Sequence, residues 1–243
     1  MYIRKTTKYP VPLQKMRLHE KKGEQMQHNA NCTEYTPEEI TNNMVTLTGI
    51  VTAINGPTDF HLSVSRLSGM ADNIPVTLSE ELCTNASITQ AIKEGITLSV
   101  RGQFRSHNKI IGDRSKLMLA VHATEAFLDA QPNGNVVTFA ENPNSIELVG
   151  FVCKAPIYRT TPFNREIADL LIAVNRSANK SDYIPAIAWG RNARFAKNLL
   201  IGEKVCLRGR VQSREYQKRL DDDTVETRTA YEISVNTISR AET

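Results

Sequence analysis

The chain has 243 residues, of which 40% are hydrophobic and 23% charged, and its formal net charge is +4. These values lie near globular averages and exclude a wholly disordered, collagen-like or disulfide-scaffold protein. No stretch approaches the roughly 20 apolar residues that span a bilayer, and the charged residues 1–25 do not form a signal peptide. We therefore expect a soluble cytoplasmic protein with no membrane association.

Four cysteines, Cys32, Cys83, Cys153 and Cys206, are widely scattered and show no metal-binding spacing. We expect them to be buried, reduced thiols, and we expect no metal and no cofactor. The sequence also lacks a phosphate-binding loop and the motifs of serine hydrolases, zinc proteases and kinases. No catalytic residue is expected, and the chain is predicted not to be an enzyme.

In chain order, residues 1–43 are polar and aperiodic, and we expect a flexible N-terminal extension there. Residues 44–130 and 144–240 are similar to each other, and the turn-rich residues 131–143 are expected to link them. A repeat of about 100 residues is too long for a solenoid and indicates a duplicated domain.

Each repeat is predicted to contain five short strands, with one helix between the third strand and the fourth. The first strand of each has an internal glycine, Gly49 or Gly150, which allows the strand to bend. In the second repeat the helix is expected over 192–200, before Gly202. This pattern predicts an all-β fold of two tandem five-stranded oligonucleotide/oligosaccharide-binding barrels, each with one short helix.

Charge separates the two repeats. Residues 144–240 carry 16 Lys and Arg against 11 Asp and Glu, a net charge of +5, whereas residues 44–130 carry 7 against 8. Most of the aromatic residues also lie in the second repeat. We therefore look for a polyanion-binding surface there.

The strand expected over 204–217 is the most informative segment. Alternation places Val205, Leu207, Gly209 and Val211 on one face, and Arg208, Arg210, Gln212, Arg214 and Tyr216 on the other. Arginines pair with phosphates, and a ring stacks on a base at ~1 to 3 kcal/mol. A solvated charged face is the alternative, but Glu215, the strand's only acid, falls on the opposite side.

Other candidate contacts lie in loops and on one further strand. Residues 155–166 form a predicted hairpin whose tip carries Tyr158, Arg159, Phe163 and Arg165, and the loop at 176–182 adds Arg176 and Lys180. Tyr183 and Trp189, six residues apart, project from one strand face as core residues or as stacking platforms. The loop at 216–228 contributes Lys218, and its run Asp221–Asp223 is expected to be a solvated tip and not a Mg²⁺ site.

Residues 144–238 resemble the bacterial single-stranded DNA-binding protein family through NSIELVGFV, YRTTPFNREIADLLIAVNR, SDYIPAIAWG, GEKVCLRGRVQSREYQ and AYEISVNTI, in family order. The resemblance implies an oligonucleotide-binding fold. It also implies sequence-independent binding and protection of single-stranded DNA in replication, recombination or repair. The candidate DNA contacts are Tyr158, Arg159, Arg176, Lys180, Tyr183, Trp189, Arg208, Arg210, Arg214, Tyr216 and Lys218.

The resemblance assigns three base-stacking positions to Tyr183, Trp189 and Tyr216, and a basic hairpin position to Arg159. A fourth stacking position falls near Ala178 and is expected to be lost. Asn164 replaces a usual turn glycine and can adopt the left-handed conformation. The chain stops at SRAET, without the family's acidic tip, so recruitment of replication proteins by that route is not expected.

The first repeat is predicted to be a divergent copy. Asn73, Ser79 and Lys109 stand at its three stacking positions, and its first hairpin is shorter. We therefore expect a structural partner for the second barrel and not an equal DNA-binding surface.

Two other functions stay open at this point. One is a primosome or replisome assembly module, akin to primosomal replication protein N, whose barrels mainly bind protein. The other is a nuclease, for which only the triple Asp run offers carboxylates. Because family members with one barrel per chain commonly assemble four barrels, we expect a homodimer, associated with the nucleoid in the cytoplasm.

Overall fold

The computed structural model describes residues 43–112, 114–128, 142–177, 180–219 and 224–241. The expected N-terminal extension, most of the expected linker at 131–143, Ala178 and Asp221–Asp223 lie outside these residues. Within the described ranges, no helix is long and apolar enough to cross a membrane, and no group of three or more His, Cys, Asp or Glu side chains could hold a metal ion.

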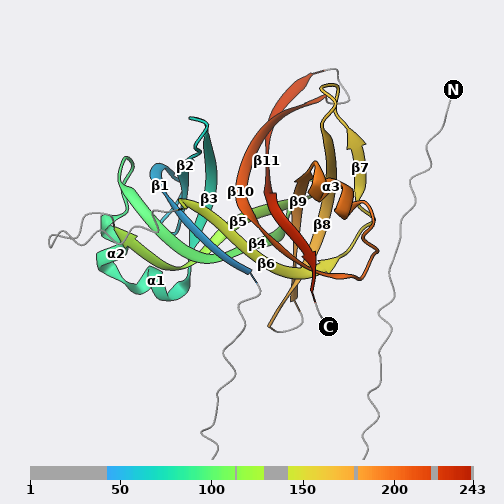
Figure 1. Cartoon of the computed structure of the whole chain (residues 1–243). Coiled ribbons are helices and arrows are strands. Elements are labelled where there is room, and N and C mark those ends of the chain that lie inside the picture. Colours follow the sequence, from blue (N-terminus) through green and yellow to red (C-terminus); the bar gives the residue numbers. More distant parts are fainter. Residues whose placement is uncertain (1–42, 113, 129–141, 178–179, 220–223, 242–243) are drawn as a thin grey trace, which may run out of the picture. The chain divides into compact units, whose positions relative to one another are not determined.

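The first barrel consists of five strands and two short helices: β1 (Asn43–Ile54), β2 (Asp59–Ser65), β3 (Ala71–Leu78), α1 (Glu80–Thr84), α2 (Ala86–Ala91), β4 (Thr97–Ile111) and β5 (Arg114–Leu128). Strand β1 pairs with both β2 and β4, and β3 runs parallel to β5. The antiparallel pairs β2–β3 and β4–β5 close the ring. Figure 1 shows this barrel in blue and green.

The second barrel repeats this order with an added short strand: β6 (Asn144–Val152), β7 (Ile157–Thr160), β8 (Glu166–Arg176), β9 (Lys180–Trp189), α3 (Arg191–Ala196), β10 (Lys204–Arg219) and β11 (Val225–Arg240). Strand β6 pairs with β8 and β10, and β9 runs parallel to β11. Strand β7 extends the sheet beyond β8. The structure therefore confirms two tandem oligonucleotide/oligosaccharide-binding barrels.

Alternating burial explains why these segments form strands. Along β1 buried and partly exposed residues alternate, and Val45, Leu47 and Val51 face the core with at most 1% of their surface exposed. Phe104 on β4 is the largest completely buried side chain of the described residues. The first strand of each barrel pairs with two strands of the same barrel, β1 with β2 and β4 and β6 with β8 and β10, as we predicted from the internal glycines.

Those glycines also permit a close approach between strands. A Cβ on Gly49 would lie 2.5 Å from the carbonyl oxygen of Ser63, and one on Gly150 would lie 2.6 Å from that of Ala173. A larger residue at either position would push β2 or β8 away from the first strand.

Some local predictions were wrong. The first barrel has two short helices, because Ser79 and Asn85 each accept backbone N–H bonds as N-caps. Helix α3 ends at Ala196, before the predicted end at residue 200. The three described cysteines are free thiols as expected, but they are partly exposed and not buried; they are Cys83, Cys153 and Cys206.

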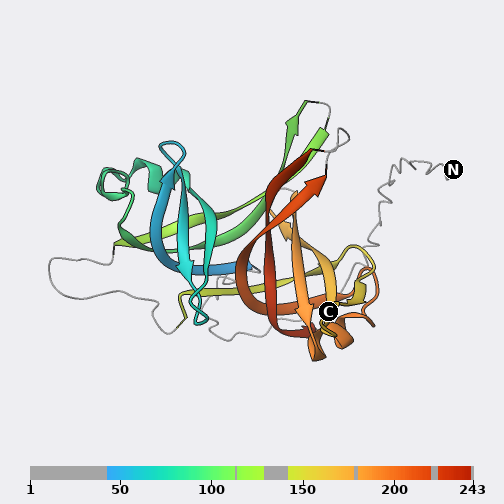
Figure 2. The same cartoon turned by 90° about the horizontal axis from the view of Figure 1, so that it is seen from above.

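The two barrels are joined by a pairing between their first strands. Strand β1 runs antiparallel to β6, with Asn43 opposite Leu148, Val45 opposite Ile146 and Leu47 opposite Asn144. Figure 2 shows these strands crossing from one barrel to the other. Since Val45 aligns with Ile146 in the repeat, the pairing is symmetric about this pair, and a local twofold relation joins the barrels.

Two asparagines at the ends of this pairing follow the same symmetry. The Asn43 side chain donates to the Phe104 carbonyl at 2.6 Å and accepts from its N–H at 3.2 Å. Asn144 bonds in the same way to Val211, at 2.7 and 2.8 Å. Both amides are almost completely buried, so each one satisfies its buried hydrogen-bonding groups while tying the first strand to the fourth.

Candidate nucleic-acid interface

The three candidate stacking rings of the second barrel are solvent-exposed. Tyr183 and Trp189 lie on β9, opposite Ala173 and Ile167 in an unbroken register, so both project from the same face. Their exposed fractions are 45% and 41%, and that of Tyr216 on β10 is 38%. These side chains are therefore accessible surface rings and not core residues.

Tyr158 is placed differently. Its hydroxyl donates to the Glu166 carboxylate, which raises the pKa of Tyr158. The ring packs against the hydrophobic core, and the Lys197 ammonium lies 4.8 Å from its centre. Tyr158 therefore stabilises the β7–β8 hairpin and is less available for stacking than the three exposed rings.

The tip of this hairpin presents a further exposed ring. Asn164 has a φ of 57°, the left-handed conformation that the sequence predicted for it. Phe163 beside it is 87% exposed. Arg159 is exposed on β7 and pairs with Asp169 at 3.0 Å. Phe163 was noted only as part of the hairpin, yet it is the most exposed aromatic side chain among the described residues.

The arginine face of β10 is not free of acids, and the sequence interpretation was wrong on this point. Arg208 pairs with Glu147 of β6 at 2.9 Å, and this hydrogen bond raises the pKa of Arg208. Arg214 lies 3.4 Å from Glu232 of β11. Both carboxylates come from neighbouring strands, so the alternation within β10 could not indicate them.

Gln212 departs from the predicted face. The β-bulge opposite Arg208 and Gly209 lies on β11 and leaves the alternation of β10 intact, but Gln212 is only 7% exposed instead of pointing outward. Gln212 donates to Glu232 at 2.7 Å and accepts from both terminal nitrogens of Arg210 at 3.1 and 3.2 Å. Burial, and to a lesser degree the nearby Arg66, lowers the pKa of Arg210.

Arg176 lies at the contact between the barrels and not in a free loop. Its Nε is 3.1 Å from Oδ2 of Asp182, whose side chain is 1% exposed. This partner makes Arg176 a weaker candidate for a phosphate than the sequence suggested. Lys180, opposite Arg176 at the start of β9, is exposed.

Two open grooves bring residues of both barrels next to the exposed rings. One, of about 520 Å³, lies between the β5 strand and the β10–β11 hairpin and includes Tyr216, Lys218, Arg228 and Lys116. Lys116 belongs to the first barrel. The sequence did not indicate it, because the binding surface was predicted where aromatic residues are frequent, and the first barrel has few of them.

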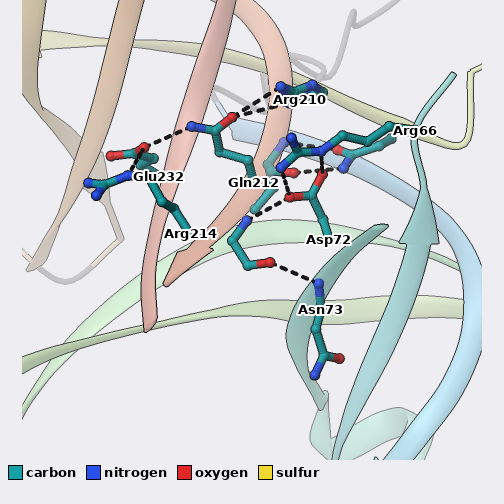
Figure 3. A network of polar contacts seen from close by, with 10 residues as sticks. Arg66, Asp72, Asn73, Arg210, Gln212, Arg214 and Glu232 are labelled. Carbon is teal, nitrogen blue, oxygen red and sulfur yellow. Dashed lines mark hydrogen bonds and ion pairs between the residues drawn. The ribbon is translucent and has the colours of Figure 1, made fainter. Parts of the chain in front are cut away.

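The second groove, of about 620 Å³, includes Trp189 and Arg214 of the second barrel together with Arg66 and Asn73 of the first. Figure 3 shows Arg66 of the first barrel next to Arg210 of β10, and Arg214 turned toward Glu232. Tyr216, Trp189 and the basic groups near them thus line grooves to which both barrels contribute.

Comparison with known proteins supports the prediction for the second barrel. Residues 143–241 match the family described as "Single-strand binding protein family". Single-stranded DNA-binding protein 1 of Staphylococcus aureus is 35% identical over 83 residues, which are 31% of this chain and 50% of that protein. The single-stranded DNA-binding protein of Clostridium tetani is 29% identical over 83 residues, 31% of this chain and 57% of that protein. The chain spans about half the length of these relatives.

Solved structures extend the likeness to both barrels. Wild-type single-stranded DNA binding protein from Thermus aquaticus has a TM-score of 0.61 over 83% of this chain and 93% of its own, at 18% identity. A deletion mutant of that protein has a TM-score of 0.57, at 19% identity, over 83% of this chain and 95% of its own. At such low identity the likeness concerns the fold alone. The sequence match to the single-strand binding protein family thus covers residues 143–241, and the solved structures extend the likeness in fold to both barrels.

Proposed function

We propose that this protein binds single-stranded DNA independently of sequence, protects it in DNA replication, recombination or repair, and is not an enzyme. The observation that carries the proposal is the exposure of three rings on one barrel, Tyr183, Trp189 and Tyr216. Every base has a π-face, so such rings bind a single strand without reading its sequence. A duplex hides these faces in its stack.

Basic side chains around the rings supply the phosphate contacts. Arg159 takes part in an exposed ion pair, and such pairs are worth only ~0 to 1 kcal/mol. A phosphate can therefore replace the carboxylate at little cost. Lys180 adds a charge at the start of β9, the strand of Tyr183 and Trp189, and Lys218 adds one in the groove of Tyr216. Arg176 and Arg214 are exceptions, because each pairs with a nearly buried carboxylate, Asp182 or Glu232, that would lose this partner if the arginine moved.

A binding isotherm with fluorescently labelled oligo(dT) tests the proposal. We expect saturable binding, competition by unlabelled oligo(dA) and oligo(dC) with similar strength, and much weaker competition by duplex DNA. Failure to bind any single strand would contradict the proposal. An RNA competitor of the same length determines whether the 2′-hydroxyl is tolerated.

The alternative as a primosome or replisome assembly module is not favoured by the family match of residues 143–241. The assembly module would show little binding of oligonucleotides, so the isotherm separates the two functions. Incubating the labelled strand with Mg²⁺ tests the nuclease alternative, and we expect the strand to stay intact.

We also propose that two chains form a homodimer with four barrels. Closed twofold symmetry is the commonest arrangement of soluble oligomers, and the chain already contains two barrels related by a local twofold. Such a dimer would provide a longer path for a single strand than one chain. We also propose that the dimer is located in the cytoplasm, associated with the nucleoid.

A further inference from the structure

Tyr183 is held at its backbone by the first barrel. Strand β9 pairs with β11 only at Ala186 and Ile187, so the start of β9 has an edge that β11 does not cover. Strand β4 of the first barrel covers this edge instead. The Tyr183 N–H donates to the Ser106 hydroxyl oxygen at 2.7 Å, across 77 residues of sequence.

Both the backbone N–H and the hydroxyl of Ser106 contact the Asp182 carboxylate. Ser106 is 6% exposed, and its backbone N–H donates to Oδ1 of Asp182 at 2.7 Å. Its hydroxyl lies 3.5 Å from the same carboxylate oxygen, so it donates there while accepting from Tyr183. The ion pair with Arg176 holds Asp182 in turn. Ser106 is therefore a preorganised acceptor for the Tyr183 N–H.

The local twofold repeats this arrangement at a position that has no ring. Oδ1 of Asp72 accepts from the Ser213 N–H at 2.8 Å, and the Asn73 N–H donates to the Ser213 hydroxyl oxygen at 2.9 Å. Figure 3 shows Asp72 of this copy bonded to Arg66. Asn73 corresponds to Tyr183 in the repeat. The chain thus contains two equivalent serine contacts, of which only one holds a candidate stacking residue.

We propose that Ser106 of the first barrel is a positioning residue for the Tyr183 stacking platform. This inference rests on the proposed binding of single-stranded DNA and gives the divergent barrel a role in it without contact to a base. Without the hydroxyl, a part-buried N–H loses its acceptor and the start of β9 is free to move. A ring on a mobile strand end must then be ordered when DNA binds, which weakens binding.

The test compares Ser106→Ala with its symmetric control Ser213→Ala in the full chain, using the oligo(dT) isotherm. Both variants lose one hydroxyl at the contact between the barrels, so thermal unfolding should show similar losses of stability. We expect Ser106→Ala to weaken binding by about three- to tenfold and Ser213→Ala to stay within about twofold of wild type. The salt dependence of Ser106→Ala should match wild type, because no phosphate contact is removed.

A double-mutant cycle with Tyr183→Ala distinguishes positioning from a general structural role. If Ser106 acts through the ring, Ser106→Ala has no further effect on binding in the Tyr183→Ala background. Independent, additive losses would overturn the proposal. Should Ser106→Ala fail to fold, Ser106→Cys replaces it, because a thiol keeps the shape but is a weak acceptor. Wild-type binding by Ser106→Cys would then overturn the proposal.

The outcomes separate this inference from the proposed function. If wild type does not bind oligo(dT), the proposed function fails. If wild type binds and the Ser106 and Ser213 variants bind equally, the positioning role fails while the function stands.

Discussion

Trp189 is the chain's only tryptophan, which makes it a direct probe of the proposed surface. It is 41% exposed and lines a groove beside Arg214. We expect oligo(dT) to quench its fluorescence, because a stacked base changes the environment of the indole. Titration with a polyanion that has no bases serves as the control and should cause little quenching. An emission spectrum that does not change at saturating oligo(dT) would contradict stacking at Trp189.

Tyr183 and Tyr216 allow a second test on single side chains. Replacing either with Ala should weaken binding by ~1 to 3 kcal/mol, the usual contribution of one stacked base. Both rings are exposed, so the variants should unfold like wild type. The matched controls are Asn73→Ala and Lys109→Ala at the equivalent positions of the first barrel, which should cost much less. Equal losses at all four positions would mean that both barrels share the strand.

Within the strands, glycines determine how closely neighbouring backbones approach. A Cβ on Gly209 of β10 would lie 2.2 Å from the carbonyl oxygen of Ser234 on β11, and neither backbone can yield easily. We expect Gly209→Ala to destabilise the fold by ~1 to 3 kcal/mol or more, as in other overpacked sites. Urea unfolding followed by circular dichroism measures this change.

Gly56 in the β1–β2 turn is the control for that substitution. Its added Cβ would meet only the Asp59 carboxylate, at 3.8 Å, and its φ is not positive. Gly56→Ala should therefore change the free energy of unfolding by no more than ~0.5 kcal/mol. If Gly209→Ala is equally harmless, the close approach of β10 and β11 is not a constraint on the fold.

For the whole molecule, the distribution of charge predicts a strong salt dependence. Each phosphate neutralised on a single strand releases about 0.7 of a condensed counterion. Because the second repeat is net basic, its affinity for oligo(dT) should fall steadily between about 50 and about 300 mM salt. Affinity that does not change over this range would favour the assembly module over DNA binding.

The proposed homodimer makes a prediction at the same scale. Light scattering at micromolar concentration should give a mass near twice the 27.2 kDa of one chain. The ratio of oligo(dT) bound per chain provides an independent check, since a strand that spans both chains binds once per dimer. A mass near that of one chain would contradict the proposal.

Prediction from sequence succeeded where the signal is local or repeated. Alternation along 204–211 identified the buried face of β10, and the six-residue spacing identified the common face of Tyr183 and Trp189. It failed at Gln212, because this side chain is buried in contact with Glu232 of β11 and with Arg210. The residue pattern of one strand does not show which residues of the neighbouring strand lie opposite it.

By itself, the sequence determined the duplicated barrels, the resemblance of the second one to the single-strand binding protein family, and the segments that carry the rings and the basic residues. Those properties follow from periodicity and from residues close together in the chain. The tertiary structure alone decided which arginines are already paired, and that the first barrel bonds to the backbone of Tyr183. Glu147 lies 61 residues from Arg208, and Ser106 lies 77 from Tyr183. The first contact forms when β6 and β10 pair within the second barrel, and the second forms when the two barrels pack together. Folding and not sequence proximity brings these atoms together.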